Sequence, residues 1–333
     1  MQRTVLITGG SGYVGSVTAW LLVQYNYRVI ILDIKKPCHS FGYSIIGNAG
    51  DVRLVASLCQ EYSVNAIIHC AASIEVGQSV KDPQLFYDNN VVVLLNLLQA
   101  MKATGVKNII FSSSAAVYGA ASSASLSEED PCRPVNPYGK TKLVGEYMLQ
   151  DYAHAYHMRY IILRYFNVAG ALPEHGLGEC HDPETHIIPL ILRAAQERKP
   201  FPIFGAQYQT KDGSCVRDYI HVLDIAYAHL KALEHLEQGS PSDTFNIGSG
   251  RGISVKELVH IIEENCHLSI PTSIRAGRMG DPAYLVADIS KAANILGWQP
   301  RYSDINYIIR SAFAYSGLPA RQASADRSAF LKE

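Results

Sequence analysis

Residues 4–15 have the sequence TVLITGGSGYVG, an apolar run followed at once by a glycine-rich turn. Glycines stand at positions 9, 12 and 15, and helix-like spacing continues to Gln24. A strand, a turn without side chains and a helix N-terminus together form a cradle for a dinucleotide pyrophosphate, because the first helical N–H groups face the phosphates. The stretch therefore predicts a dinucleotide site built from Gly9, Gly12, Tyr13, Val14 and Gly15.

Further apolar runs, rich in Ile and Val, alternate with longer stretches of helical spacing. None of them shows the polar alternation of a half-exposed strand, so each is typical of a parallel strand covered on both faces. We expect an α/β fold with a Rossmann-like doubly wound parallel sheet. The expected strands are 4–8, 28–33, 66–70, 108–113 and 160–165, and the expected helices are 13–24, 83–104 and 137–155.

The regular alternation breaks after residue 165. A helix is expected around 188–198, a strand at 243–248 and a helix at 254–265, followed by a loop-rich stretch to Trp298. We interpret the later part as a smaller substrate-binding subdomain interleaved with the sheet. The predicted division is a Rossmann domain at 1–167 to which 215–249 returns, a subdomain at 168–214 and 250–320, and a polar tail at 321–333.

Composition narrows the classes of partner. Apolar residues make up 48% and the formal net charge is −1, which argues for a globular protein and against nucleic acid or an anionic membrane as partner. The seven cysteines lack any CxxC pair, which favours reduced thiols. No signal peptide and no apolar run of spanning length is evident, so we expect a cytoplasmic protein.

An acidic residue at the end of the second strand indicates which dinucleotide is bound. Asp33 stands 18 residues beyond Gly15, where its carboxylate can accept hydrogen bonds from an adenosine ribose. The same charge would repel a 2′-phosphate, so Asp33 favours NAD over NADP. Asp51 and Val52, a little further on, suit an adenine contact.

The sequence NPYGKTK at 136–142 predicts a helix start and a candidate base. Asn136 can cap the helix, Pro137 suits its first position, and Tyr138 and Lys142 then share one face. We expect the adjacent ammonium to favour the phenolate of Tyr138. Ser114, at the end of the fourth strand, can donate a hydrogen bond to a substrate oxygen, because ligands bind at the carboxyl ends of such strands.

At this point the chain resembles the extended short-chain dehydrogenases/reductases, and among them the UDP-glucose 4-epimerases. The similar stretches run from residue 4 to residue 298 and are more specific than the glycine motif alone. They include DNNV at 88–91, FSSSAAVYG at 111–119, RYFNVAGA at 164–171, VRDYIHVLD at 216–224 and GDPAYLVADI at 280–289.

The resemblance implies interconversion of UDP-glucose and UDP-galactose, part of galactose metabolism, through transient NAD-dependent oxidation at sugar carbon 4. Tyr138 would act as the base, Lys142 would also bond the nicotinamide ribose, and Ser114 would assist proton transfer. It implies a cofactor contact for Asn90 and a homodimer formed through the helices at 83–104 and 137–155. The implied substrate-binding residues are Ser114, Asn167, His186, Phe204, Arg217, Tyr219, Arg278, Asp281 and Leu285.

Several departures from the family pattern leave the sugar and some contacts open. The loop at 73–76 has no lysine for a cofactor phosphate, and Ala116 replaces a common threonine. Leu285 stands at the position that gates N-acetylated sugars and is neither bulky tyrosine nor a small residue. A 4-epimerase of UDP-GlcNAc, a UDP-pentose or a UDP-uronic acid therefore stays open.

Other classes of function fit the sequence less well. A 4,6-dehydratase would place an acid soon after Ser114, where Ala115 and Ala116 stand instead. A non-catalytic NAD-sensing regulator would be expected to lose Tyr138 or Lys142. Cys180, His181 and His186 crowd one loop but lack the paired spacing of a structural zinc site, so no metal is expected.

Overall fold

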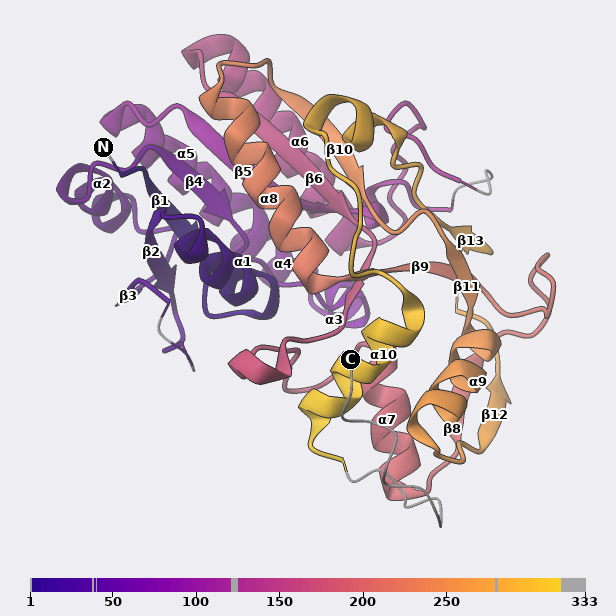
Figure 1. Cartoon of the computed structure of the whole chain (residues 1–333). Coiled ribbons are helices and arrows are strands. Elements are labelled where there is room, and N and C mark those ends of the chain that lie inside the picture. The colour runs from indigo at the N-terminus through magenta and orange to yellow at the C-terminus, as the bar shows by residue number, and fades with distance from the viewer. Residues whose placement is uncertain (1, 38, 40, 121–124, 279–280, 319–333) are drawn as a thin grey trace.

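The computed structural model describes residues 2–37, 39, 41–120, 125–278 and 281–318. Its centre is a parallel sheet of seven strands in the order β10-β6-β5-β4-β1-β2-β3 (Figure 1). This confirms the predicted α/β class with a parallel Rossmann-like sheet. The strands are β1 (Thr4–Thr8), β2 (Arg28–Asp33), β3 (Tyr43–Ile46), β4 (Ala66–His69), β5 (Asn108–Ser114), β6 (Arg159–Tyr165) and β10 (Asp243–Ile247).

Helices cover both faces of this sheet because its apolar strands need burial on each side. In β1 the side chains of Val5 and Ile7 join one core cluster and that of Leu6 joins the other, as the period of two requires. The first face is covered by α1 (Tyr13–Gln24) and α8 (Val222–Glu237), and the second by α2 (Val52–Glu61), α5 (Val93–Thr104) and α6 (Pro137–Tyr156).

The stretch 83–104, expected as one helix, is three elements. It comprises α4 (Pro83–Tyr87), a π turn η1 (Asp88–Val92) and α5. The wide π turn holds the buried Asn90, whose amide bonds to Ser73 and to the Thr141 hydroxyl. Such π turns recur at functional sites. A short helix α3 (Val76–Lys81) precedes the three.

A second group of elements lies beside the carboxyl ends of the central strands (Figure 1). A small sheet has the order β11-β9-β13, with β7 also paired to β9, and β8 pairs with β12. The elements of this second group are β7 (Asn167–Ala169), α7 (Ile187–Glu197), β8 (Phe201–Phe204), β9 (Val216–His221), β11 (Gly252–Ser254), α9 (Val255–Cys266), β12 (Thr272–Arg275), β13 (Tyr284–Leu285) and α10 (Ile305–Ser316). Short turns complete the chain at η2 (Ala115–Val117), η3 (Pro173–His175) and η4 (Ala292–Leu296).

The predicted domain division stays a prediction. Within the stretch expected to return to the first domain, β10 pairs with β6 in the central sheet, whereas β9 belongs to the small sheet. The polar tail 321–333 lies outside the described residues. No helix in the part of the chain that the structure describes combines the length and apolar character needed to cross a membrane.

Candidate active site

The glycine-rich turn between β1 and α1 packs tightly against its own backbone and against the segment that follows β4. Gly9 adopts φ +72°, and a Cβ there would lie 2.5 Å from the amide nitrogen of Ala71. A Cβ on Gly15 would overlap the carbonyl oxygen of Gly9. The first and third glycines of the predicted motif are therefore required by this backbone, whatever binds to it.

The N-terminus of α1 is open to an anion. Gly12 occupies the capping position without a side chain to cap it, and the first turn holds no acidic residue. The N–H groups of Tyr13 and Val14 donate to no acceptor in any hydrogen bond found among the described residues. Unused N–H groups at a helix start fit a phosphate, which is what the sequence predicted here.

Asp33 lies beside this turn, at the end of β2. Its carboxylate accepts hydrogen bonds from the N–H of Ser11 and of Lys35, each 2.9 Å long. The acid is thereby aimed at the glycine turn, where a ribose attached to the phosphates would lie. The geometry suits the predicted ribose contact.

Other predicted cofactor residues are committed to local structure. Asp51 caps α2, because one carboxylate oxygen accepts from the N–H groups of Arg53 and Leu54, both at 3.0 Å. Val52 is the half-buried first residue of that helix. Asn90 ties the loop after β4 to α6, as described above. Cofactor contacts through Asp51, Val52 and Asn90 stay predictions.

Helix α6 presents Tyr138 and Lys142 on one buried face. Asn136 caps the helix by accepting from the N–H of Gly139 at 2.8 Å, and Pro137 is its first residue. Lys142 Nζ donates to the carbonyl oxygen of Ser112 at 2.7 Å and lies 5.9 Å from the centre of the Tyr138 ring. The spacing of four residues therefore brings the phenol and the ammonium together, as predicted.

The electrostatic state of this pair differs from the sequence expectation. Burial raises the pKa of Tyr138, and a hydrogen bond with the Ser114 hydroxyl opposes this only in part. Burial also lowers the pKa of Lys142 to about 8. These shifts favour the neutral phenol, because desolvation outweighs any help from the neighbouring ammonium.

Ser114 ends β5 and caps the short turn η2, where its Oγ accepts from the N–H of Ala116 at 3.2 Å. Its contact with Tyr138 places a second hydroxyl at the candidate base. The two preceding serines serve the framework instead: Ser112 bonds to the Tyr165 hydroxyl at 3.0 Å and Ser113 donates to Glu146 at 2.5 Å. Of the three serines at 112–114, only Ser114 is thus available to the candidate catalytic site, and the other two stabilise the framework.

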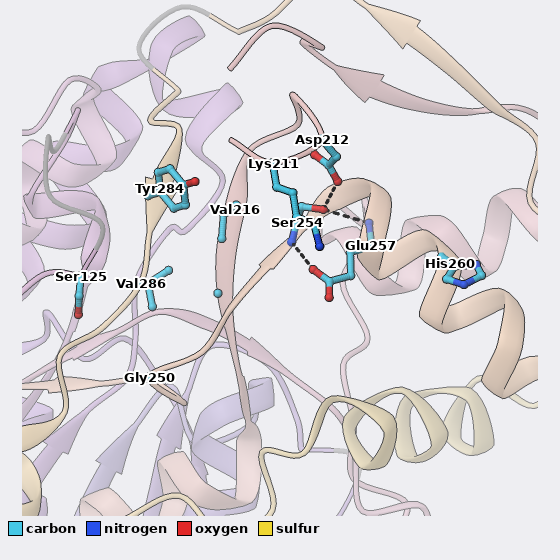
Figure 2. Close-up of a pocket in the computed structure, with 11 residues that line it drawn as sticks. Ser125, Lys211, Asp212, Val216, Gly250, Ser254, Glu257, His260, Tyr284 and Val286 are labelled. Atoms are coloured by element: carbon cyan, nitrogen blue, oxygen red, sulfur yellow. Dashed lines mark hydrogen bonds between the residues drawn. The ribbon is translucent and has the colours of Figure 1, made fainter. Parts of the chain in front are cut away.

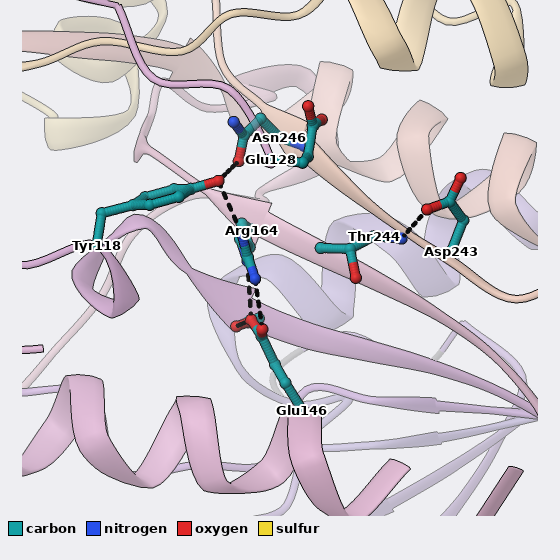
Figure 3. Close-up of polar contacts among 8 residues, drawn as sticks. Tyr118, Glu128, Glu146, Arg164, Asp243, Thr244 and Asn246 are labelled. Carbon is teal, nitrogen blue, oxygen red and sulfur yellow. Dashed lines mark hydrogen bonds and ion pairs between the residues drawn. The ribbon is translucent and has the colours of Figure 1, made fainter. Parts of the chain in front are cut away.

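A buried polar network, which the sequence did not predict, supports α6 (Figure 3). Glu146, one turn beyond Lys142, forms two hydrogen bonds with the Arg164 guanidinium, at 3.0 and 2.7 Å. Arg164 also donates to the Tyr118 hydroxyl at 2.9 Å, and this hydroxyl donates to Asn246 Oδ1 at 2.7 Å. The network links α6 to β6, to β10 and to the turn after Ser114, and so fixes the candidate catalytic face.

The predicted substrate residues fall into one connected group and a few separate positions. Arg217 on β9 forms an ion pair with Asp281 at 2.6 Å and donates to the carbonyl oxygen of Pro282 at 2.9 Å. Leu285 is the strand partner of Arg217. The guanidinium of Arg278 lies 4.1 Å from the centre of the Phe204 ring.

Leu285 connects this group to the candidate catalytic residues. Its side chain packs against an apolar cluster that includes Phe166, Tyr118 and Ala115, the residue directly after Ser114. Asn167 follows Phe166 and donates to the backbone oxygen of Asp218 at 3.0 Å. The structure therefore places Leu285 and Arg217 on the side of the small sheet that adjoins the end of β5.

Tyr219 and His186 lie differently from the rest. Tyr219 is only 2% exposed and belongs to the core beneath the small sheet, and burial raises the pKa of its hydroxyl. This burial agrees with a packing role for Tyr219. His186 is the N-cap residue just before α7, and its Nδ1 lies 2.6 Å from Glu179 Oε1. Substrate contacts through either residue stay predictions.

A hollow of about 760 Å³ lies elsewhere, on the outer side of the small sheet (Figure 2). Val216 and Tyr284 line it, whereas the next strand pair, Arg217 and Leu285, faces the opposite side. Three of its polar lining residues are engaged at the start of α9: Ser254 bonds to Asp212 and accepts from the N–H of Glu257. None of the predicted site residues lines this hollow.

Comparison with known proteins gives one consistent result. Residues 5–248 match the NAD dependent epimerase/dehydratase family. A UDP-glucose 4-epimerase of Halalkalibacterium halodurans is 43% identical over 93% of this chain and 94% of its own length. The crystal structure of UDP-glucose 4-epimerase from Brucella ovis in complex with NAD is 44% identical, with a TM-score of 0.92, over 96% of this chain and all of that one.

A further solved structure includes a nucleotide. UDP-glucose 4-epimerase from Bifidobacterium longum, in complex with NAD⁺ and UDP, is 34% identical over 94% of this chain and 98% of its own, with a TM-score of 0.87. These similarities extend over nearly the whole chain and confirm the resemblance drawn from its motifs. The chain therefore belongs to the NAD dependent epimerase/dehydratase family.

Proposed function

We propose that this chain is an NAD-dependent UDP-glucose 4-epimerase that interconverts UDP-glucose and UDP-galactose. The observation that carries the proposal is that Tyr138 and Lys142 are both buried on α6, with 5.9 Å between Lys142 Nζ and the centre of the Tyr138 ring. The chain is also similar to UDP-glucose 4-epimerases over nearly all of its length. A phenol in this setting can move a proton to and from a sugar hydroxyl.

The geometry of the glycine turn and of Asp33 is suited to binding NAD. The N–H groups of Tyr13 and Val14, which donate to no acceptor among the described residues, would hold the pyrophosphate, and Asp33 would accept from the adenosine ribose. Asp51 and Val52 would lie near the adenine. Bound NAD supplies a hydride acceptor and donor for carbon 4 of the sugar.

Tyr138 would take the proton from the sugar 4-hydroxyl and later return it. Because burial raises its pKa, the phenolate needs positive charge close by. Lys142, fixed by the carbonyl oxygen of Ser112, supplies part of that charge, to the extent that its own pKa of about 8 leaves it protonated. Ser114 would hold the substrate oxygen by a hydrogen bond as its proton leaves.

The nucleotide part of the substrate would bind along the small sheet. A diphosphate needs fixed cations in a chain of almost neutral charge, and Arg217 and Arg278 are suited to it by their forked donors. Asp281 now neutralises Arg217 and would turn to a ribose hydroxyl when phosphate takes its place. Asn167 and Phe204 complete this proposed surface.

The decisive test separates an epimerase from an NAD-binding regulator. Purified protein is assayed for UDP-galactose turnover, and NAD is measured after release by denaturation. Turnover together with released NAD is the expected result. Bound NAD without turnover of UDP-galactose, UDP-GlcNAc, UDP-pentoses or UDP-uronic acids would contradict the proposal. The same panel shows whether Leu285 admits an N-acetyl group.

We also propose a homodimer formed by α5, α6 and the elements that precede α5. Apolar side chains are exposed on these elements, which is what an uncovered interface would present: Leu85 at 40%, Tyr87 at 40%, Val92 at 45%, Leu95 at 37% and Tyr147 at 54%. The cytoplasmic location stays a prediction.

A further inference from the structure

Four side chains gather in the loop between η3 and α7, outside the proposed catalytic site. They are Glu179, His181, Glu184 and His186, and each offers one ligand atom within 4.8 Å of all the others. The sequence drew attention to Cys180 in this loop, but Cys180 is exposed and is not a member of the group. The two glutamates were not recognised, because only the fold turns them toward the histidines.

The ligand atoms converge on one point. His186 Nδ1 lies 2.6 Å and His181 Nδ1 lies 3.2 Å from Glu179 Oε1. His186 Nδ1 is also 3.4 Å from Glu184 Oε1, and His181 Nδ1 is 4.0 Å from it. Ligands about 2.0–2.1 Å from a tetrahedral metal lie about 3.3 Å apart. The observed separations bracket that value.

Several of these atoms are buried without a hydrogen-bond partner. Glu179 Oε1, His181 Nδ1 and His186 Nδ1 are all shielded from solvent, and none makes a hydrogen bond of acceptable geometry among the described residues. The Glu179 side chain is only 7% exposed and that of Glu184 only 4%. Buried polar atoms are nearly always satisfied, so a shared unfilled partner explains all three at once.

The chemistry of the set specifies the partner. Two carboxylates and two neutral imidazoles carry two negative charges, and a divalent cation would neutralise them. Nitrogen and oxygen donors in a set of four suit zinc, whereas calcium and magnesium prefer oxygen alone. Glu184 Oε1 is further oriented by the N–H groups of Thr185 and His186, at 2.7 and 2.8 Å, as supporting contacts at metal sites usually are.

We propose that Glu179, His181, Glu184 and His186 bind one divalent transition-metal ion, best matched by Zn²⁺. Four protein ligands leave no open position, so the site is structural. It joins the loop at 179–184 to His186, the N-cap residue of α7. His181 also meets the ring of Tyr13 edge-on, with 6.4 Å between ring centres, so the ion steadies a loop beside the predicted cofactor turn.

The competing explanation is that the glutamates form ion pairs with protonated histidines and that no metal is bound. The two glutamates raise the pKa of His186 to about 10, so a protonated His186 could balance part of the charge. A proton and Zn²⁺ would then compete for the same nitrogen. The two accounts predict different metal contents at neutral pH.

The test measures metal directly and does not depend on turnover. The protein is purified from zinc-supplemented cells without chelators, and metal is determined by mass spectrometry. We expect about one zinc per chain, falling at least about tenfold in Glu179→Gln and in His181→Ala, since each removes one of four ligands. Cys180→Ser, beside the cluster, and His175→Ala, outside it, are matched controls and keep the metal.

Folding of each variant is checked by circular dichroism, and wild-type protein stripped by a chelator is titrated with Zn²⁺ and with Co²⁺. Recovery of one metal per chain, a rise in Tm and the visible spectrum of tetrahedral Co²⁺ support the site even where a variant does not fold. The site is excluded by stripped wild-type protein that takes up no metal at neutral pH. Variants that bind zinc as the wild type does exclude it as well.

Discussion

The carboxylate of Glu146 and the guanidinium of Arg164 form a doubly hydrogen-bonded ion pair beneath the candidate catalytic helix, with both side chains no more than 8% exposed. Glu146 lies one helical turn from Lys142, and Ser113, the neighbour of Ser114, donates to the same carboxylate. The pair therefore joins both halves of the candidate catalytic face to the central sheet.

Breaking this pair should destabilise the fold strongly. Glu146→Gln leaves the Arg164 charge buried and unpaired, which costs about 3–5 kcal/mol in free energy of unfolding. Urea unfolding measures the loss. The control is Lys231→Ala, which breaks a half-exposed pair with Glu234 of 2.7 Å and should cost less than about 1 kcal/mol. An equal loss in the two variants would show that breaking the buried pair costs no more free energy of unfolding than breaking the half-exposed pair.

Buried neutral histidines predict a loss of stability in acid. Burial lowers the pKa of His229 from 6.5 to about 4, and that of His221 similarly, because neither ring can be charged in its site without loss of solvation. The unfolded chain therefore binds more protons below pH 6.5. The stabilisation is complete above pH 6.5 and is lost as the pH falls toward 4, by roughly 3 kcal/mol per histidine.

The variant His229→Gln tests whether this histidine causes part of the loss of stability in acid. Its Nδ1 donates to the carbonyl oxygen of Ile225 at 3.1 Å and its Nε2 accepts from Tyr165, so the neutral ring is fully used. The variant is less stable at pH 7, but its free energy of unfolding should fall less steeply between pH 6.5 and 4. The same acid slope in both proteins would assign the loss to other groups.

Asp33 should determine the preference for NAD over NADP. Replacing it with alanine removes the carboxylate that would accept from the ribose and would repel a 2′-phosphate. The preference is the dissociation constant of NADP divided by that of NAD, measured by calorimetry on cofactor-free protein. We expect this ratio to fall at least about tenfold in Asp33→Ala, a change of about 1.4 kcal/mol. Lys35→Ala is the control on the same loop. Unchanged selectivity in Asp33→Ala would remove Asp33 from the ribose site.

The proposed dimer surface can be tested by mass. Leu95→Glu places a charge among exposed apolar side chains of α5, where the wild-type residue is 37% exposed. Light scattering should show a dimer for the wild type and mainly monomer for the variant, because an unpaired charge is costly in an apolar interface. Ile274→Glu, 54% exposed on β12, is the control. A wild-type monomer would contradict the proposal.

Much of the fold could be predicted from local pattern. The apolar runs and the glycine turn identified the strands from β1 to β6 other than the exposed β3, because a covered parallel strand must be apolar throughout. Strand β3 was missed since three of its four residues are exposed. Helix α8 was not recognised although it is buried along most of its length, because a helix that is apolar on several sides lacks a clear stripe.

The site was predicted less completely because its contacts are long-range. Tyr138 and Lys142 are four residues apart, so helical spacing alone brings them together. The Glu146–Arg164 pair and the cluster of Glu179 and His186 depend on how loops and helices fold back, which no local pattern specifies. The direction of the Tyr138 pKa was also missed, because burial is a property of the tertiary structure.

The central claim is that Tyr138 is the base of a UDP-sugar epimerase, and Tyr138→Phe tests it most directly. The variant keeps the buried ring, which meets Phe86 edge-on at 6.4 Å, and loses only the hydroxyl. We predict that kcat for UDP-galactose falls at least about a hundredfold while NAD stays bound, with Tyr152→Phe on the same helix as control. Turnover by Tyr138→Phe at a rate near that of the wild type would contradict the account.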